Sequence, residues 1–236
     1  MPKPDSDPEV NHEKLAFQVG SKETVAALKD WKKDRFKILL PWTVSSLCIA
    51  LLMFSGAWAV ATFSHQEAVD FTPIFSRPDG SFHDMIWILI RNLMVLLMHL
   101  LVCIAAYLAR RTVPMQAKYT KGVNRWAHEH AGSFAMPLVA GLTVYSLCWQ
   151  TWQLGLDLNS SSETLEMSPL ALLARAALHG IPELTAIFLP LAACLILGHQ
   201  KKWNQLAAAA IITAVVAVPV IVIAAAIETW VTHGLF

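Results

Sequence analysis

Three ionisable residues stand four positions apart in an otherwise apolar stretch of the sequence. They are Arg175, His179 and Glu183. On an α-helix a spacing of four places all three on one face, about one turn apart. A carboxylate one turn from an imidazole can accept its N–H and raise the pKa of the imidazole. The spacing therefore predicts a polar stripe along one side of an apolar helix.

Further polar residues lie in two other apolar stretches. Arg91 and Asn92 belong to one of them, and Glu228 lies near the end of the other. An ionised side chain in hydrocarbon costs roughly 2.5 to 3.5 kcal/mol on insertion scales, so each needs a partner or a purpose. Counting from the span ends puts these residues at the depth of His179 and Glu183. We expect one cluster in the outer half of a bilayer.

Three interpretations of this cluster remain open. It can be a buried network of ion pairs that fixes helix packing, a pathway for a substrate or ion, or a metal or catalytic site. Catalytic zinc uses three protein ligands, and His179 and Glu183 supply two. A third would have to come from His99 or Glu228 on another helix. The His-Glu-His run at 128–130 is a weak metal-like pairing that we expect to be solvated, so the sequence predicts no metal and no cofactor.

The elements that carry these residues are hydrophobic. Of 236 residues, 56% are hydrophobic and 15% charged, against about 25% charged in soluble domains. The fold class is all-α, a polytopic transmembrane helical bundle with five spans. The spans are expected at about 39–63, 85–109, 133–156, 169–198 and 206–230. The fourth contains Pro182 and Pro190, which predict a kinked or broken helix.

Lysine and arginine predict the orientation. Basic residues gather before the first span, in the 110–132 connection and in the short 199–205 connection. The 64–84 loop has one arginine against four acidic residues, and the 157–168 loop has acidic residues and no basic one. This alternation predicts a cytoplasmic N-terminus and five crossings. With a net charge of +1, nothing in the composition points to nucleic acid.

The N-terminal part divides into two segments before the transmembrane domain of 38–236. Residues 1–12 are polar and proline-rich, which predicts a disordered tail. Residues 13–37 carry a helical pattern of apolar residues among several lysines. This pattern predicts a basic amphipathic helix at the membrane surface, with a solvated extension of the first span as the alternative.

The run AALHGIPELTAIFLPLAACLILG at 176–198 resembles the signature of the stage II sporulation protein M family. His179, Gly180, Glu183 and Leu184 match its His-Gly-x-x-Glu-Leu element, and Leu197-Gly198 matches its closing pair. The final stretch IVIAAAIETWVT resembles the closing helix of the family, with Glu228 at the acidic position. Arg91-Asn92 resembles an Asn-Asn pair and departs at its first residue. The resemblance covers about 30–232 and implies a multi-pass protein of the bacterial plasma membrane.

Three functions from different classes follow. The first is a non-enzymatic subunit or scaffold of a membrane complex of the stage II sporulation protein M type. The second is a transporter or permease-like subunit for a peptide or small solute, with ATP from a partner because no GxxxxGK[ST] motif occurs. The third is an intramembrane hydrolase. We expect the lipid bilayer and other membrane proteins as partners, with a homo-oligomer, a partner ATPase or a cell-wall enzyme as candidates.

Overall fold

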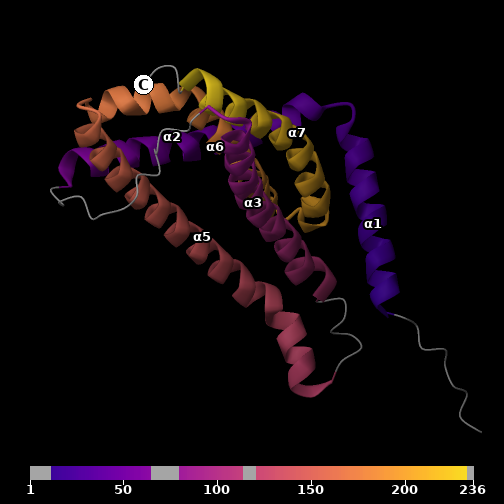
Figure 1. Cartoon of the computed structure of the whole chain (residues 1–236). Helices are drawn as coiled ribbons and strands as arrows, with labels where there is room; N and C mark the ends of the chain where they lie inside the picture. The colour runs from indigo at the N-terminus through magenta and orange to yellow at the C-terminus, as the bar shows by residue number, and fades with distance from the viewer. Residues whose placement is uncertain (1–11, 65–79, 114–120, 233–236) are drawn as a thin grey trace, which may run out of the picture.

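The computed structural model describes residues 12–64, 80–113 and 121–232. These residues form helices and no strand (Figure 1). The long helices are α1 (His12–Trp31), α2 (Arg35–Phe63), α3 (Phe82–Tyr107), α5 (Gly122–Thr164), α6 (Pro169–His199) and α7 (Leu206–Ala226). Two π-helical turns, η1 (Leu108–Thr112) and η4 (Ile227–Thr232), extend α3 and α7, and a 3₁₀ turn, η3 (Trp203–Gln205), precedes α7.

Four helical stretches of the described chain are long and apolar enough to cross a membrane. They are Arg35–Phe63, Phe82–Arg110, Pro169–His199 and Trp203–Val231. They contain the first, second, fourth and fifth predicted spans, so the membrane-compatible all-α architecture is confirmed. The predicted third span lies inside α5, which is not among the four. Its apolar run is interrupted by Ser146, Gln150 and Gln153.

Several boundaries differ from the sequence prediction. The helix expected over 13–37 is two elements, because a turn at Lys32–Asp34 separates α1 from α2. The 157–168 segment is helical as far as Thr164, and the 128–130 run also lies inside α5. No glycine or proline, the strongest local stop signals, lies between Asp157 and Thr164, and polar residues alone do not require a helix to end there. The predicted tail lies outside the described residues except for His12, and so do the central parts of both long connections.

Local sequence explains where the helices begin. Ser81 caps α3: its Oγ accepts from the backbone N–H of Asp84 at 3.2 Å, and the Asp84 carboxylate accepts from the Ser81 N–H at 3.2 Å. Ser168 caps α6 with a single bond, in which its Oγ accepts from the backbone N–H of Ala171, and Pro169 stands at the first helical position. These caps satisfy N–H groups that have no partner within the helix.

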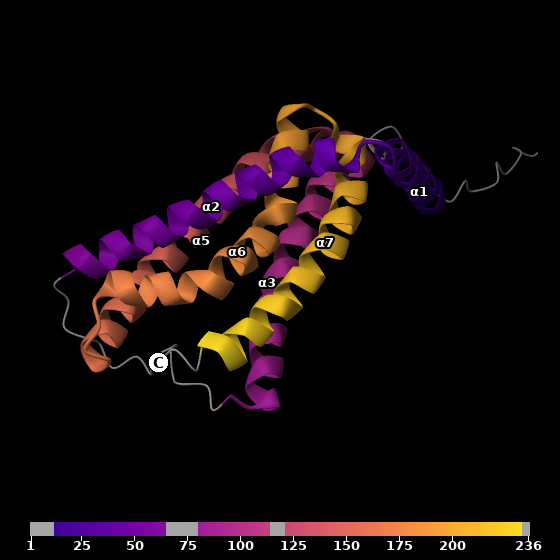
Figure 2. The same cartoon turned by 90° about the horizontal axis from the view of Figure 1, so that it is seen from above.

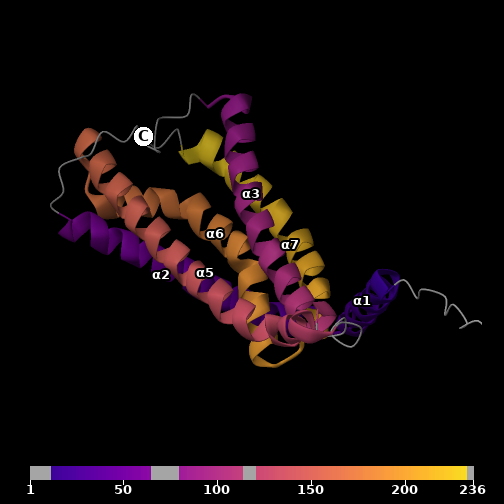
Figure 3. The ribbon, with the colours of Figure 1, turned by 90° about the horizontal axis from the view of Figure 1, so that it is seen from below.

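The helices pack as two arms that meet at one end. α2, α5 and the first half of α6 form one arm, and α3 and α7 form the other (Figures 2 and 3). The arms meet where α6 ends and α7 begins, around a core that includes Trp42, Cys103 and Leu206. α6 packs against α2, α3 and α7, and so joins the two arms. Arg175, His179 and Glu183 therefore lie on the helix that joins the two arms.

Candidate functional site

The polar stripe of α6 lies partly inside the protein. His179 and Glu183 are buried, with 9% and 8% of their surfaces exposed. Gly180, between them, faces α2, where a Cβ would lie 2.8 Å from Cζ of Phe54. Glycine thus allows α2 and α6 to approach closely beside the two ionisable side chains.

Glu228 reaches this stripe from the π-helical turn η4. Its Oε2 lies 3.9 Å from Nε2 of His179. The turn is attached to the start of α3, because Nε1 of Trp230 donates to the carbonyl oxygen of Gly80 at 3.1 Å. π-helical turns within α-helices occur often at functional sites.

Arg91 and Asn92 complete the group from α3. Asn92 is 3% exposed and lies beside Glu183. Arg91 is exposed on the surface of the bundle, yet its charge acts on His179, Glu183 and Glu228. The structure therefore brings together five of the residues selected from the sequence, contributed by α3, α6 and η4.

Arg175 and His99 lie differently. Arg175 is half-buried one turn before His179, and it is not among the charges that act most on Glu183. His99 is directed to its own helix, where Nδ1 contacts the carbonyl oxygen of Val95 at 2.8 Å. Its ring packs edge-on against Phe188, with 5.3 Å between centroids. Neither residue adds a ligand to the pair of His179 and Glu228.

The group contains two buried polar atoms that have no hydrogen-bond partner among the described residues. They are Nδ2 of Asn92 and Oε2 of Glu183. The two side chains are neighbours, but their geometry does not form a hydrogen bond between these atoms. A buried polar group without a partner costs about 1 to 3 kcal/mol, so this site is polar and incompletely paired.

Sequence reasoning missed two donors that contact α6 near its second proline. Oγ of Ser46 on α2 donates to the carbonyl oxygen of Thr185. Sγ of Cys103 on α3 donates to the carbonyl oxygen of Pro190 at 3.1 Å. The missing N–H of Pro190 leaves the carbonyl oxygen of Ala186 without its helical donor, and neither acceptor is that atom, so the sequence offers no specific signal for these two bonds. The identity of the donors depends on helix pairing, which the sequence does not display.

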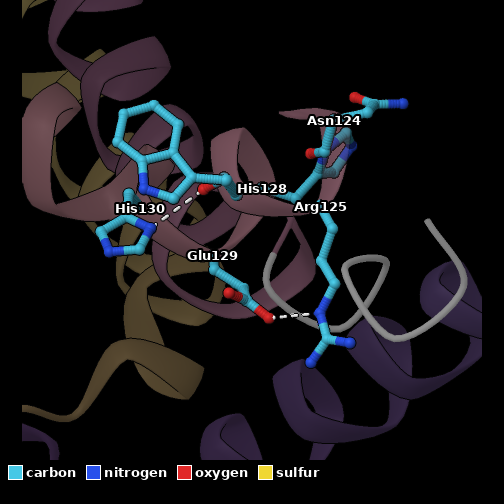
Figure 4. A network of polar contacts seen from close by, with 6 residues as sticks. Asn124, Arg125, His128, Glu129 and His130 are labelled. Carbon is cyan, nitrogen blue, oxygen red and sulfur yellow. Dashed lines mark hydrogen bonds and ion pairs between the residues drawn. The ribbon is translucent and has the colours of Figure 1, made fainter. Parts of the chain in front are cut away.

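The histidines at 128 and 130 each contact a backbone carbonyl oxygen one turn earlier in α5. Nδ1 of His130 contacts the carbonyl oxygen of Trp126 at 3.0 Å, and Nδ1 of His128 contacts that of Asn124 at 2.7 Å (Figure 4). Between them, Glu129 pairs with Arg125 at 2.7 Å. Across the described ranges, no three His, Cys, Asp or Glu side chains are grouped so that they could hold a metal ion.

Comparison of this chain with protein-family models, with curated proteins and with solved structures finds no match.

Proposed function

We propose that this chain is a multi-pass protein of a bacterial plasma membrane with a cytoplasmic N-terminus and five crossings. Four apolar helices support membrane insertion, and the alternating distribution of lysine and arginine supports the orientation. The third crossing is then the 133–156 part of α5. Pro182 and Pro190 lie inside the continuous helix α6, whose ribbon changes direction along its length (Figure 3), and we attribute this bend to them.

Within that membrane, we propose that the chain is a non-enzymatic subunit of a larger complex of the stage II sporulation protein M type. The observation that carries this proposal is a polar pair on an unpacked part of α5. Nε2 of Gln150 donates to Oγ of Ser146 at 2.8 Å, and both side chains are exposed. Polar side chains at membrane depth are used between helices rather than toward lipid. This side of α5 is therefore suited to another protein.

Site-specific photocrosslinking tests the proposal. A photoreactive amino acid at Gln150 should form adducts with protein, either a second copy or a different membrane protein. Tyr145 is the matched control, because it is 67% exposed on the same helix and lies about 140° around it from Gln150. A probe there should form adducts mainly with lipid. If neither Gln150 nor Tyr145 yields protein adducts, α5 faces lipid on both sides and the proposal is wrong. Equal adduct yields at the two positions would also contradict it, because the partner would then not be specific to the polar side of α5.

A permease-like subunit is the second candidate, favoured by the unpartnered atoms of Asn92 and Glu183. Such groups suit a path in which water or a solute supplies the missing partners. In a cysteine-free background, Asn92→Cys should react with a small charged thiol reagent added from outside. Met94→Cys, on the exposed face of the same helix, should stay protected by lipid. Protection of both positions would exclude a water-filled path beside Asn92. The non-enzymatic subunit would then be the better-supported of the two functions. No observation of the site favours the hydrolase.

A further inference from the structure

One oxygen of the buried Glu183 carboxylate lacks a hydrogen-bond donor within the part of the chain that the structure describes. Its Oε2 has no partner among the described residues, and the neighbouring Nδ2 of Asn92 has none either. Both side chains are more than nine-tenths buried. An ionised carboxylate in such surroundings is costly unless donors or a counter-charge compensate for it.

The charges around Glu183 do not balance. Glu228 from η4 and Arg91 from α3 are the charged groups that act most on it, and His179 lies one turn away on its own helix. α7 contributes no ionisable residue, and the charged residues of α2, Arg35 and Lys37, lie at its N-terminal end. Two carboxylates therefore share one guanidinium, which is itself exposed. With both carboxylates ionised, the site carries one surplus negative charge.

The available atoms suit a proton better than a metal cation. Hard cations such as Ca²⁺ and Mg²⁺ are surrounded by six or more oxygen ligands. Here the Glu183 carboxylate lies beside the Asn92 amide, the His179 imidazole contacts Glu228, and no group of three potential metal ligands occurs in the described ranges. A protonated carboxyl can instead accept from the Asn92 N–H through one oxygen and donate from the other.

We propose that Glu183 and Glu228, with Asn92 and His179 beside them, form a site that binds one exchangeable proton. The site lies near the end of the bundle where Trp230 contacts Gly80, and the side chain of Glu228 is 23% exposed. Protons therefore exchange from this end, which is the outer side in the proposed topology. The inference rests on the proposed function only in requiring that the chain spans a membrane.

Labelling with dicyclohexylcarbodiimide tests the site in the full-length protein in liposomes. This apolar carbodiimide adds to protonated carboxyl groups, and peptide mass spectrometry locates the adduct. We expect Glu183 to be labelled at low pH. Above the midpoint of its titration, labelling should fall about tenfold per pH unit, within a series from about pH 5 to pH 9. Glu163 is the control, because it is exposed at the end of α5 and should stay unlabelled.

A second variant separates a proton site from a merely structural one. Arg91→Gln removes a positive charge that favours the ionised carboxylate, so labelling of Glu183 should persist to higher pH while helicity is unchanged. Labelling that is absent, or constant over the whole series, would overturn the proposal. Labelling that sodium ions suppress at fixed pH would also overturn it, in favour of a metal cation. Failure to span the membrane would appear independently, as reaction of cysteines on both sides with an impermeant reagent.

Discussion

The close contact of α2 with α5 depends on Gly155. A Cβ at this position would lie 2.5 Å from Cβ of Val60 and 2.8 Å from the carbonyl oxygen of Ala57. Neither neighbour can move easily, because one is a stiff β-branched side chain and the other is backbone. Gly141 lies in the same helix, and a Cβ there would meet nothing within 4 Å. Alanine at the two positions therefore separates helix propensity from packing.

Both substitutions gain about 1 kcal/mol of helix propensity. Gly141→Ala should keep this gain, so its free energy of unfolding should equal or exceed that of the wild type. Gly155→Ala should in addition suffer overpacking, which costs about 1 to 3 kcal/mol. We therefore expect the free energy of unfolding of Gly155→Ala to lie about 1 to 3 kcal/mol below that of Gly141→Ala.

Equilibrium unfolding in mixed micelles, followed by circular dichroism, measures this difference directly. Comparing the two variants with each other cancels the contribution of the glycine-to-alanine change itself. Equal stability of the two variants would refute the reasoning, since it would mean that α5 does not pack on α2 through Gly155.

Three further predictions follow from the topology and the buried charges. Lys121→Cys should be protected from an impermeant thiol reagent in intact cells and Glu163→Cys labelled, and the reverse pattern would contradict the orientation. Burial raises the pKa of Asp157 above its ordinary 3.8, so the folded state binds more protons and loses stability as pH rises from 3.8 toward the raised pKa. Asp157→Asn should therefore be at least as stable at neutral pH and show a flatter stability–pH profile in the same unfolding assay. Arg91→Leu combined with Glu183→Leu should destabilise less than the sum of the single changes, and additive effects in a double-mutant cycle would argue against their coupling.

Charged residues are costly to bury in apolar helices, and this cost is the reason that the polar cluster could be predicted from the sequence. His179 and Glu183 were placed on one helical face by spacing alone, and the need for counter-charges indicated Arg91 and Glu228 on other helices. Whether these residues act as a site remains a prediction. The unpartnered state of Asn92 could not be foreseen, because it depends on a side-chain geometry set by three packed elements.

Helix ends were harder to predict than helix positions. The acidic segment after 156 was expected to be a loop, yet α5 continues to Thr164 because no glycine or proline intervenes. The turn at Lys32–Asp34 also has no glycine or proline, and the packing of Trp31 against Trp42, with 5.5 Å between ring centroids, accompanies it. Such a contact between helices is a tertiary interaction, and the local sequence pattern does not predict it.

The donors that contact α6 near Pro190 also bear on how the protein is made. Ser46 and Cys103 lie on α2 and α3, and both precede α6 in the chain. During synthesis, earlier segments emerge first. The two donor helices are therefore available in the bilayer before the proline-containing helix arrives. The sequence order thus lets α6 insert beside the side chains that donate to two of its carbonyl oxygens, whereas a permuted chain beginning with α6 would insert this helix before either donor is present.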